Sequence, residues 1–114
     1  MRSEVPEAFK NYFRDLYSDC FRILVSRQEG YGPTNIEALG PHGVFSRLAF
    51  DKCARVMNSM NGHLEGGKVQ LYEDWYSEEV RDALIDIANY SMIMIALGEE
   101  QWSKIARDNG TARG

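Results

Sequence analysis

The residue types and spacings best suited to chemistry lie in the segment from Ser77 to Leu97. Four acid and amide side chains recur there at steps of three and four residues, so that on a helix they form one polar stripe. The other positions of the segment are mainly apolar, which places the stripe partly inside the protein. A carboxylate in that setting must be paired, hydrogen-bonded or bound to a cation, because a bare buried charge is very costly. The stripe consists of Glu79, Asp82, Asp86 and Asn89.

The first turn of this segment also has a purely structural interpretation. Ser77 is suited to cap the helix, and Glu78 and Glu79 follow it where the helix dipole favours negative charge. That interpretation does not reach Asp82 or Asp86, which lie further along the helix. We therefore expect these two acids to take part in a site, with Glu79 open to either explanation.

A second predicted helix, Val44 to Met60, carries basic residues on its polar side. Arg47, Asp51 and Arg55 follow one another at i, i+4 and i+8, with Lys52 beside them. Intrahelical ion pairs are one explanation, and each is worth only tenths of a kcal/mol. The alternative sets arginines opposite the carboxylates of the other helix, as in a site for phosphate and metal.

The remaining chain predicts an all-α protein with a single domain, 1–114. Apolar residues at helical spacing predict a first helix from Glu7 to Gln28. We expect its five aromatic residues mainly in the core, with Tyr12 and Tyr17 as the first exceptions. The glycine-rich stretch Gly30 to Asn35 predicts a loop, in which Tyr31 either stacks on a base or packs against the protein. Further predictions are a helical turn at Ile36–Leu39, a break at Gly40–Gly43, a connecting loop at Asn61–Asp74 and helical turns at Gln101–Asp108.

Composition restricts the partners and the compartment. The 114 residues carry a formal net charge of −4, which argues against double-stranded nucleic acid as the main partner. The two cysteines, Cys20 and Cys53, fall in apolar helical patterns and predict reduced thiols in a cytoplasmic protein. The N-terminus lacks the apolar core of a signal peptide, and the longest uncharged run, Ile87 to Gly98, is too short to span a bilayer. We expect no membrane partner.

Three separated motifs, GYGPTN, HGVFSRLAFDKCARVMN and EEVRDALIDIANY, carry a family resemblance. In order and spacing they resemble the phage- and bacterium-associated "nucleotide modification associated domain 1" family, over about Arg27 to Met94. That family in turn resembles the all-α nucleoside triphosphate pyrophosphohydrolases of the MazG and dimeric dUTPase group. Those enzymes bind metal with an EExxE helix and an ExxD helix, and Asn often stands seven residues after the Asp. Here Glu79 and Asp82 match ExxD, and Asn89 stands seven residues past Asp82.

The resemblance implies a metal-dependent cleavage of a nucleoside triphosphate, NTP or dNTP, into a monophosphate and pyrophosphate. Glu79 and Asp82, with Asp51, would hold Mg²⁺ or Mn²⁺, and Asp86 would be a ligand or the base that orients water. The nucleotide itself would be bound by a second set of residues: basic side chains on the phosphates, an aromatic ring on the base or sugar, and amides as hydrogen-bonding groups. That set is Tyr31, Asn35, Arg47, Lys52, Arg55 and Asn89.

Two other functions stay open at this point. The EExxE helix has no counterpart, and Asp51 is the one acid on the second helix, which favours a non-catalytic protein that sequesters a nucleotide or nucleotide signal, as in phage counter-defence. A purely structural bundle would instead pair Arg47 and Arg55 with Asp82 and Asp86 across one interface.

The predicted architecture is a small bundle of three main helices plus a short C-terminal helix. Such a monomer leaves much aromatic and methionine surface uncovered, so we expect oligomerisation to complete the bundle. The resemblance likewise implies a homo-oligomer, a dimer or tetramer, working in the cytoplasm (the host cytoplasm if phage-encoded). Candidate interface residues are Met57, Met60, Met92 and Met94.

Overall fold

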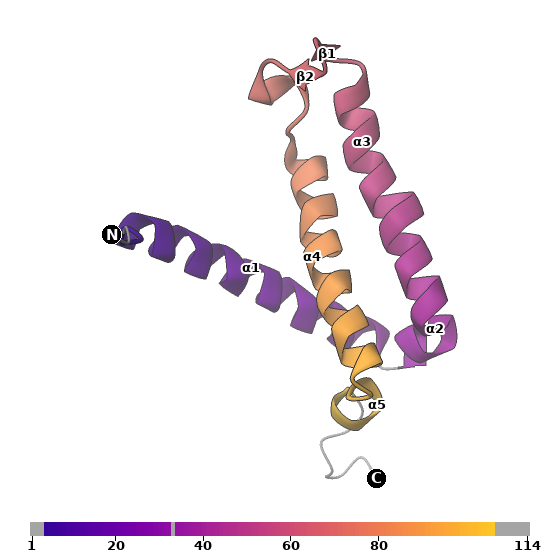
Figure 1. Cartoon of the computed structure of the whole chain (residues 1–114). Coiled ribbons are helices and arrows are strands. Elements are labelled where there is room, and N and C mark those ends of the chain that lie inside the picture. The colour runs from indigo at the N-terminus through magenta and orange to yellow at the C-terminus, as the bar shows by residue number, and fades with distance from the viewer. Residues whose placement is uncertain (1–3, 33, 107–114) are drawn as a thin grey trace.

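A computed structural model describes residues 4–32 and 34–106 of the chain (Figure 1). Nearly all of its regular structure is helical, which confirms the predicted all-α class with three main helical arms and a short C-terminal helix. Pro33 and the predicted helical residues beyond Ala106 lie outside the described residues. The elements in chain order are α1 (Glu7–Tyr31), α2 (Thr34–Ser46), the π-helical segment η1 (Arg47–Lys52), α3 (Cys53–Asn61), β1 (Leu64–Glu65), β2 (Lys68–Val69), the 3₁₀ turn η2 (Tyr72–Asp74), α4 (Glu78–Gly98) and α5 (Trp102–Ile105).

Helices α2, η1 and α3 follow one another as one rod that lies alongside α4 (Figure 1). The C-terminal half of α1 crosses α4 near the middle of α4, and the N-terminal half of α1 extends away from the other elements (Figure 1). The site described below lies where α1, the rod and α4 meet. None of the described helices is long and apolar enough to cross a membrane.

Two apolar clusters hold the rod against α4. One joins Val56 of α3 to Val80 and Ala83 of α4. The other joins Val44 of α2 to Ile93 of α4, together with Ile36 and Trp102. Along both helices, Lys52 and Asp86 fall between the two clusters, so apolar packing above and below fixes the height at which these two charged residues meet.

The rod contains a bend, which the sequence predicts, and an irregular turn, which the sequence does not predict. The predicted break at Gly40–Gly43 is confirmed at Gly40, whose φ of 69° and ψ of 172° are available almost only to glycine. The prediction of a regular α-helix over Val44–Met60 is wrong in one stretch. The chain stays helical there but widens into a π-helix over Arg47–Lys52, and π-helical turns frequently occur at functional sites.

The predicted ends of other elements differ in ways that matter for the site. Helix α1 continues through Gly30 to Tyr31 rather than ending at Gln28, and Gly32 ends it with a φ of 75° and an N–H donated to the Gln28 carbonyl. Ser77 is confirmed as the cap of α4, since its hydroxyl accepts a hydrogen bond from the Val80 N–H at 3.2 Å.

The predicted connecting loop Asn61–Asp74 contains a short antiparallel hairpin. Leu64 pairs with Val69 and Glu65 with Lys68. The turn between the strands uses Gly66 and Gly67, which both have positive φ, as tight hairpin turns require.

The expectation that the α1 aromatics lie mainly in the core is wrong for Phe9 and Phe21 in the single chain, whereas Tyr12 and Tyr17 were the expected exceptions. No residue of α1 is buried. Phe9, Tyr12, Tyr17 and Phe21 are 54–69% exposed, because only the C-terminal part of α1 contacts another element.

We predict that Gly40→Ala destabilises the protein by about 1–3 kcal/mol, because alanine must adopt a backbone conformation that is strained for any residue with a Cβ. No heavy atom lies within 4 Å of the added methyl, so the cost is conformational rather than steric. Gly30→Ala is the matched control: Gly30 lies inside α1 with equal space around it, and alanine there stabilises by about 0.5–1 kcal/mol. Urea unfolding of both variants checks this, and equal effects of the same sign would contradict it.

Candidate functional site

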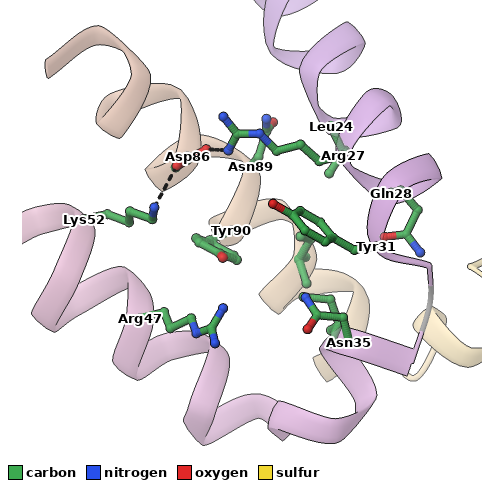
Figure 2. A pocket seen from close by; sticks show the side chains of 12 residues that line it. Leu24, Arg27, Gln28, Tyr31, Asn35, Arg47, Lys52, Asp86, Asn89 and Tyr90 are labelled. Carbon is green, nitrogen blue, oxygen red and sulfur yellow. Dashed lines mark hydrogen bonds and ion pairs between the residues drawn. The ribbon is translucent and has the colours of Figure 1, made fainter. Parts of the chain in front are cut away.

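A cavity of about 250 Å³ lies between the C-terminal part of α1, the start of α2, η1 and the second half of α4 (Figure 2). Its charged lining consists of Arg27, Arg47, Lys52 and Asp86. Tyr31 and Tyr90 supply aromatic rings, and Asn35 and Asn89 supply amides. The cavity thus combines groups able to bind an anion with groups able to bind a planar ring.

Asp86 is the buried carboxylate of the site, with only 7% of the residue exposed. It forms ion pairs with Arg27 of α1 and with Lys52 of η1, whose ammonium lies 3.0 Å from Oδ2 (Figure 2). Burial lowers the pKa of the Lys52 ammonium, and the neighbouring Asp51 carboxylate opposes this lowering. The two cations meet the requirement that a buried carboxylate be paired.

The π-helical turn explains why Lys52 lies in the cavity together with Arg47. In an α-helix, side chains five residues apart point about 140° away from each other. The wider π turn, closed by the Cys53 N–H donating to the Leu48 carbonyl, reduces that angle and brings both side chains to the cavity. The prediction that Arg47, Asp51 and Arg55 share one face rested on a regular α-helix. In the π-helical turn, Lys52 rather than Asp51 lies in the cavity with Arg47.

The other two residues of that predicted stripe lie outside the cavity. Asp51 accepts a hydrogen bond at 2.9 Å from Arg55, whose side chain is 64% exposed. This is the intrahelical ion pair that the sequence offered as the structural alternative, and pairs of this kind contribute less than about 1 kcal/mol. Arg55 and Asp51 are therefore surface residues in this chain.

Asn89 joins α4 to α1. Its side-chain amide donates a hydrogen bond of 3.0 Å to the backbone carbonyl of Cys20. A further link joins Arg81 to Asp19 at 3.2 Å, and the guanidinium of Arg22, followed by that of Arg81, lowers the pKa of the Asp19 carboxyl. With the Arg27–Asp86 pair, these polar links hold α1 across α4.

The continuation of α1 past Gln28 gives Tyr31 its place. Arg27 and Tyr31 are four residues apart on one helix face, so both reach the cavity (Figure 2). Tyr31 and Asn35 are brought together with the basic residues, as predicted, although Tyr31 comes from a helix end rather than from a loop. The Tyr31 ring is 67% exposed, which leaves one of its faces open.

Three further cavity residues, Arg27, Gln28 and Tyr90, were not predicted from the sequence. A signal for Arg27 was present: it stands three residues after Leu24 and four before Tyr31, so it continues the apolar stripe of the first helix with a charge. The Gln28 side-chain nitrogen is buried and has no hydrogen-bond partner among the described residues. No sequence signal distinguishes Gln28 or Tyr90 from ordinary helix residues.

The structure does not bring Glu79 and Asp82 to the cavity. Both share the helix face of Asp86 in the sequence pattern, but both are exposed, and neither lines the cavity. Within residues 4–32 and 34–106, no group of three or more acid, histidine or cysteine side chains is placed to hold a metal ion. Asp86 is already paired with two cations, which would repel Mg²⁺. The predicted ligands Glu79, Asp82 and Asp51 therefore do not fit a metal site within one chain.

Searches of protein-family models, curated proteins and solved structures returned no match to this chain. The resemblance drawn from the sequence motifs therefore stays a prediction.

We predict that Asp86→Asn lowers the free energy of unfolding by about 3 kcal/mol, because it leaves Arg27 without a counter-ion and leaves the largely buried Lys52 only its longer contact with Asp51, at 3.8 Å. Asp51→Asn is the matched control. Its loss is expected to stay below about 1 kcal/mol, because the Asp51–Arg55 pair is solvated and Lys52, 3.8 Å from Asp51, keeps its shorter pair with Asp86. Guanidinium unfolding curves measure both. Similar losses for the two variants would show that the buried ion pairs do not hold the three elements together.

Proposed function

We propose that the cavity binds a nucleotide and that the protein acts as a non-catalytic nucleotide-binding protein, the alternative that the missing EExxE helix favoured. The proposal rests mainly on the ion pairs of the Asp86 carboxylate. Among the described residues that line the cavity it is the one acid, and its carboxylate is bound by Arg27 and Lys52. A carboxylate engaged in this way is poorly placed to hold a metal ion or to activate water.

The charge of the cavity supports an anionic ligand. Three cationic side chains against one carboxylate leave a formal charge of +2, in a chain whose net charge is −4. Arg47 has no ion-pair partner among the described residues and reaches toward the centre of the cavity (Figure 2). Guanidinium groups bind phosphate oxygens through paired hydrogen bonds, so Arg47 is the residue we assign to phosphate.

The aromatic and amide groups support a base on the same ligand. Tyr31 and Tyr90 face the cavity from two different helices (Figure 2). Stacking of a base on an aromatic side chain is worth about 1–3 kcal/mol. Asn35 lies next to Tyr31 and offers both a donor and an acceptor to a base edge or sugar.

The size of the cavity favours a mononucleotide. Its volume of about 250 Å³ lies below the roughly 300–1,000 Å³ of pockets that enclose drug-sized ligands. A nucleic-acid strand or a dinucleotide would extend well beyond it.

The competing proposal is the metal-dependent pyrophosphohydrolase implied by the sequence resemblance. It requires that Glu79 and Asp82, exposed on α4, receive further acids from a neighbouring subunit to bind Mg²⁺ or Mn²⁺. A homo-oligomer is therefore part of that proposal, and the binding proposal is compatible with one.

We predict that the protein binds a nucleotide from a panel of mono-, di- and triphosphates in the presence of EDTA, and that Arg47→Ala weakens that binding about 10- to 100-fold. The magnitude follows from the loss of hydrogen bonds to a charged group, about 1.5–3 kcal/mol, at 1.4 kcal/mol per tenfold. Arg55→Ala is the control, because Arg55 lies on the same rod but outside the cavity, and its affinity is expected within about twofold of the wild type. Calorimetric titration measures all three proteins, and equal losses for the two arginines would contradict the assignment.

We also predict that the bound nucleotide is recovered intact after incubation with Mg²⁺ or Mn²⁺. Asp82→Asn and Glu79→Gln should leave affinity unchanged, because neither side chain lines the cavity. Chromatography of the released nucleotide is the measurement. If monophosphate and pyrophosphate form with the wild type but not with Asp82→Asn, the binding proposal is wrong and the pyrophosphohydrolase proposal is favoured.

A further inference from the structure

A second concavity, of about 540 Å³, lies between α1 and the first part of α4. In contrast to the nucleotide cavity it is mainly apolar, and we call it the α1–α4 groove. Phe13, Tyr17 and Phe21 line it from α1, and Leu84, Ile85 and Met92 line it from α4. Leu24 and Asn89 line both the groove and the nucleotide cavity, so the two adjoin at the crossing of the helices.

Helix α1 lacks the burial that a long amphipathic helix normally obtains. It has 25 residues, none of them buried, and five of its aromatic residues are more than half exposed. The radius of gyration of the chain is 17.5 Å, against about 13 Å for a compact chain of this length. The chain is therefore extended rather than compact, and α1 is one of the two arms that extend from the crossing point (Figure 1).

The exposed apolar area is sufficient for a stable dimer. Phe9, Tyr12, Tyr17, Phe21, Tyr76, Leu84 and Met92 are each between 37% and 69% exposed. At about 150–250 Å² for a fully buried aromatic side chain, their exposed parts amount to roughly 800 Å². That is about the area each partner buries in a standard-size protein–protein interface.

We infer that the α1–α4 groove is occupied by the N-terminal half of α1 from a second copy of this chain. Two copies related by a two-fold axis would each place α1 in the groove of the other, which buries the aromatic stripe and the groove together. The polar side of α1 is compatible with this pairing. It carries charges of both signs along its length, so antiparallel α1 helices bring no block of like charges together.

The dimer would also support the nucleotide cavity, a consequence that rests on the proposed function. In one chain, α1 is held across α4 by a few polar links and carries Arg27 and Tyr31 of the cavity wall. A second α1 packed into the adjoining groove fixes the angle of the crossing. Loss of the dimer should therefore weaken nucleotide binding without removing any residue that contacts the ligand.

The mass in solution tests the interface. Light scattering of the full chain from 1 to 100 μM should give twice the chain mass of 13.0 kDa. Tyr17→Glu and Phe21→Glu should give a monomer with the helical circular dichroism retained. Tyr72→Glu is the matched control, because Tyr72 is 84% exposed but lies on η2, away from the groove, and this variant should stay dimeric. A monomeric wild type, or a dimer that survives both α1 variants, overturns the inference.

Nucleotide titration of the same variants tests the link to the cavity. Monomeric Tyr17→Glu should bind the nucleotide at least tenfold more weakly than wild type, while Tyr72→Glu should bind as wild type does. Equal affinity of the monomeric variant overturns the link to the cavity. A dimeric wild type that binds no nucleotide would instead contradict the proposed function and leave the interface standing, so the two failures are distinguishable.

Discussion

The ion pairs of Asp86 connect the three parts of this structure. Asp86 stands on α4, Lys52 on the π-helical turn of the rod and Arg27 on α1, so one carboxylate is bound by cations from two other elements. Apolar clusters on either side set its height between the rod and α4. Because removal of one partner from a buried pair leaves an uncompensated charge, the arrangement is costly to break. The same pairs hold two cations at the edge of a cavity that Arg47 completes.

The sequence was sufficient for the fold class, the main helices, the cap at Ser77 and the break at Gly40, because these depend on local periodicity and on residues with special backbone properties. It was also sufficient for six of the residues now found in the cavity: Tyr31, Asn35, Arg47, Lys52, Asp86 and Asn89. The π-helical turn was not predictable, since no residue type signals it. That one irregularity moves Lys52 into the site and leaves Asp51 on the surface.

The acids of α4 show that residues on one face of a helix can differ in burial. Glu79, Asp82 and Asp86 share one face by spacing, yet only Asp86 is buried. Their difference comes from where α1 crosses α4, which is a property of tertiary packing rather than of α4 itself. For the same reason Arg27 was missed: its importance arises from the partner it meets 59 residues later in the chain. The exposed aromatic stripe of α1 follows from the same crossing, since most of α1 lies beyond it.

In the proposed function, Asp86 organises cations for a nucleotide rather than holding a metal ion. Crystals of the protein grown with its nucleotide and Mn²⁺ would test it most directly, through the anomalous scattering of manganese. We expect phosphate density against Arg47, unbroken pairs of Asp86 with Arg27 and Lys52, and no anomalous peak at Asp86. A manganese peak coordinated by Asp86, or by Glu79 and Asp82 together with acids of a neighbouring subunit, would contradict the account and favour the hydrolase.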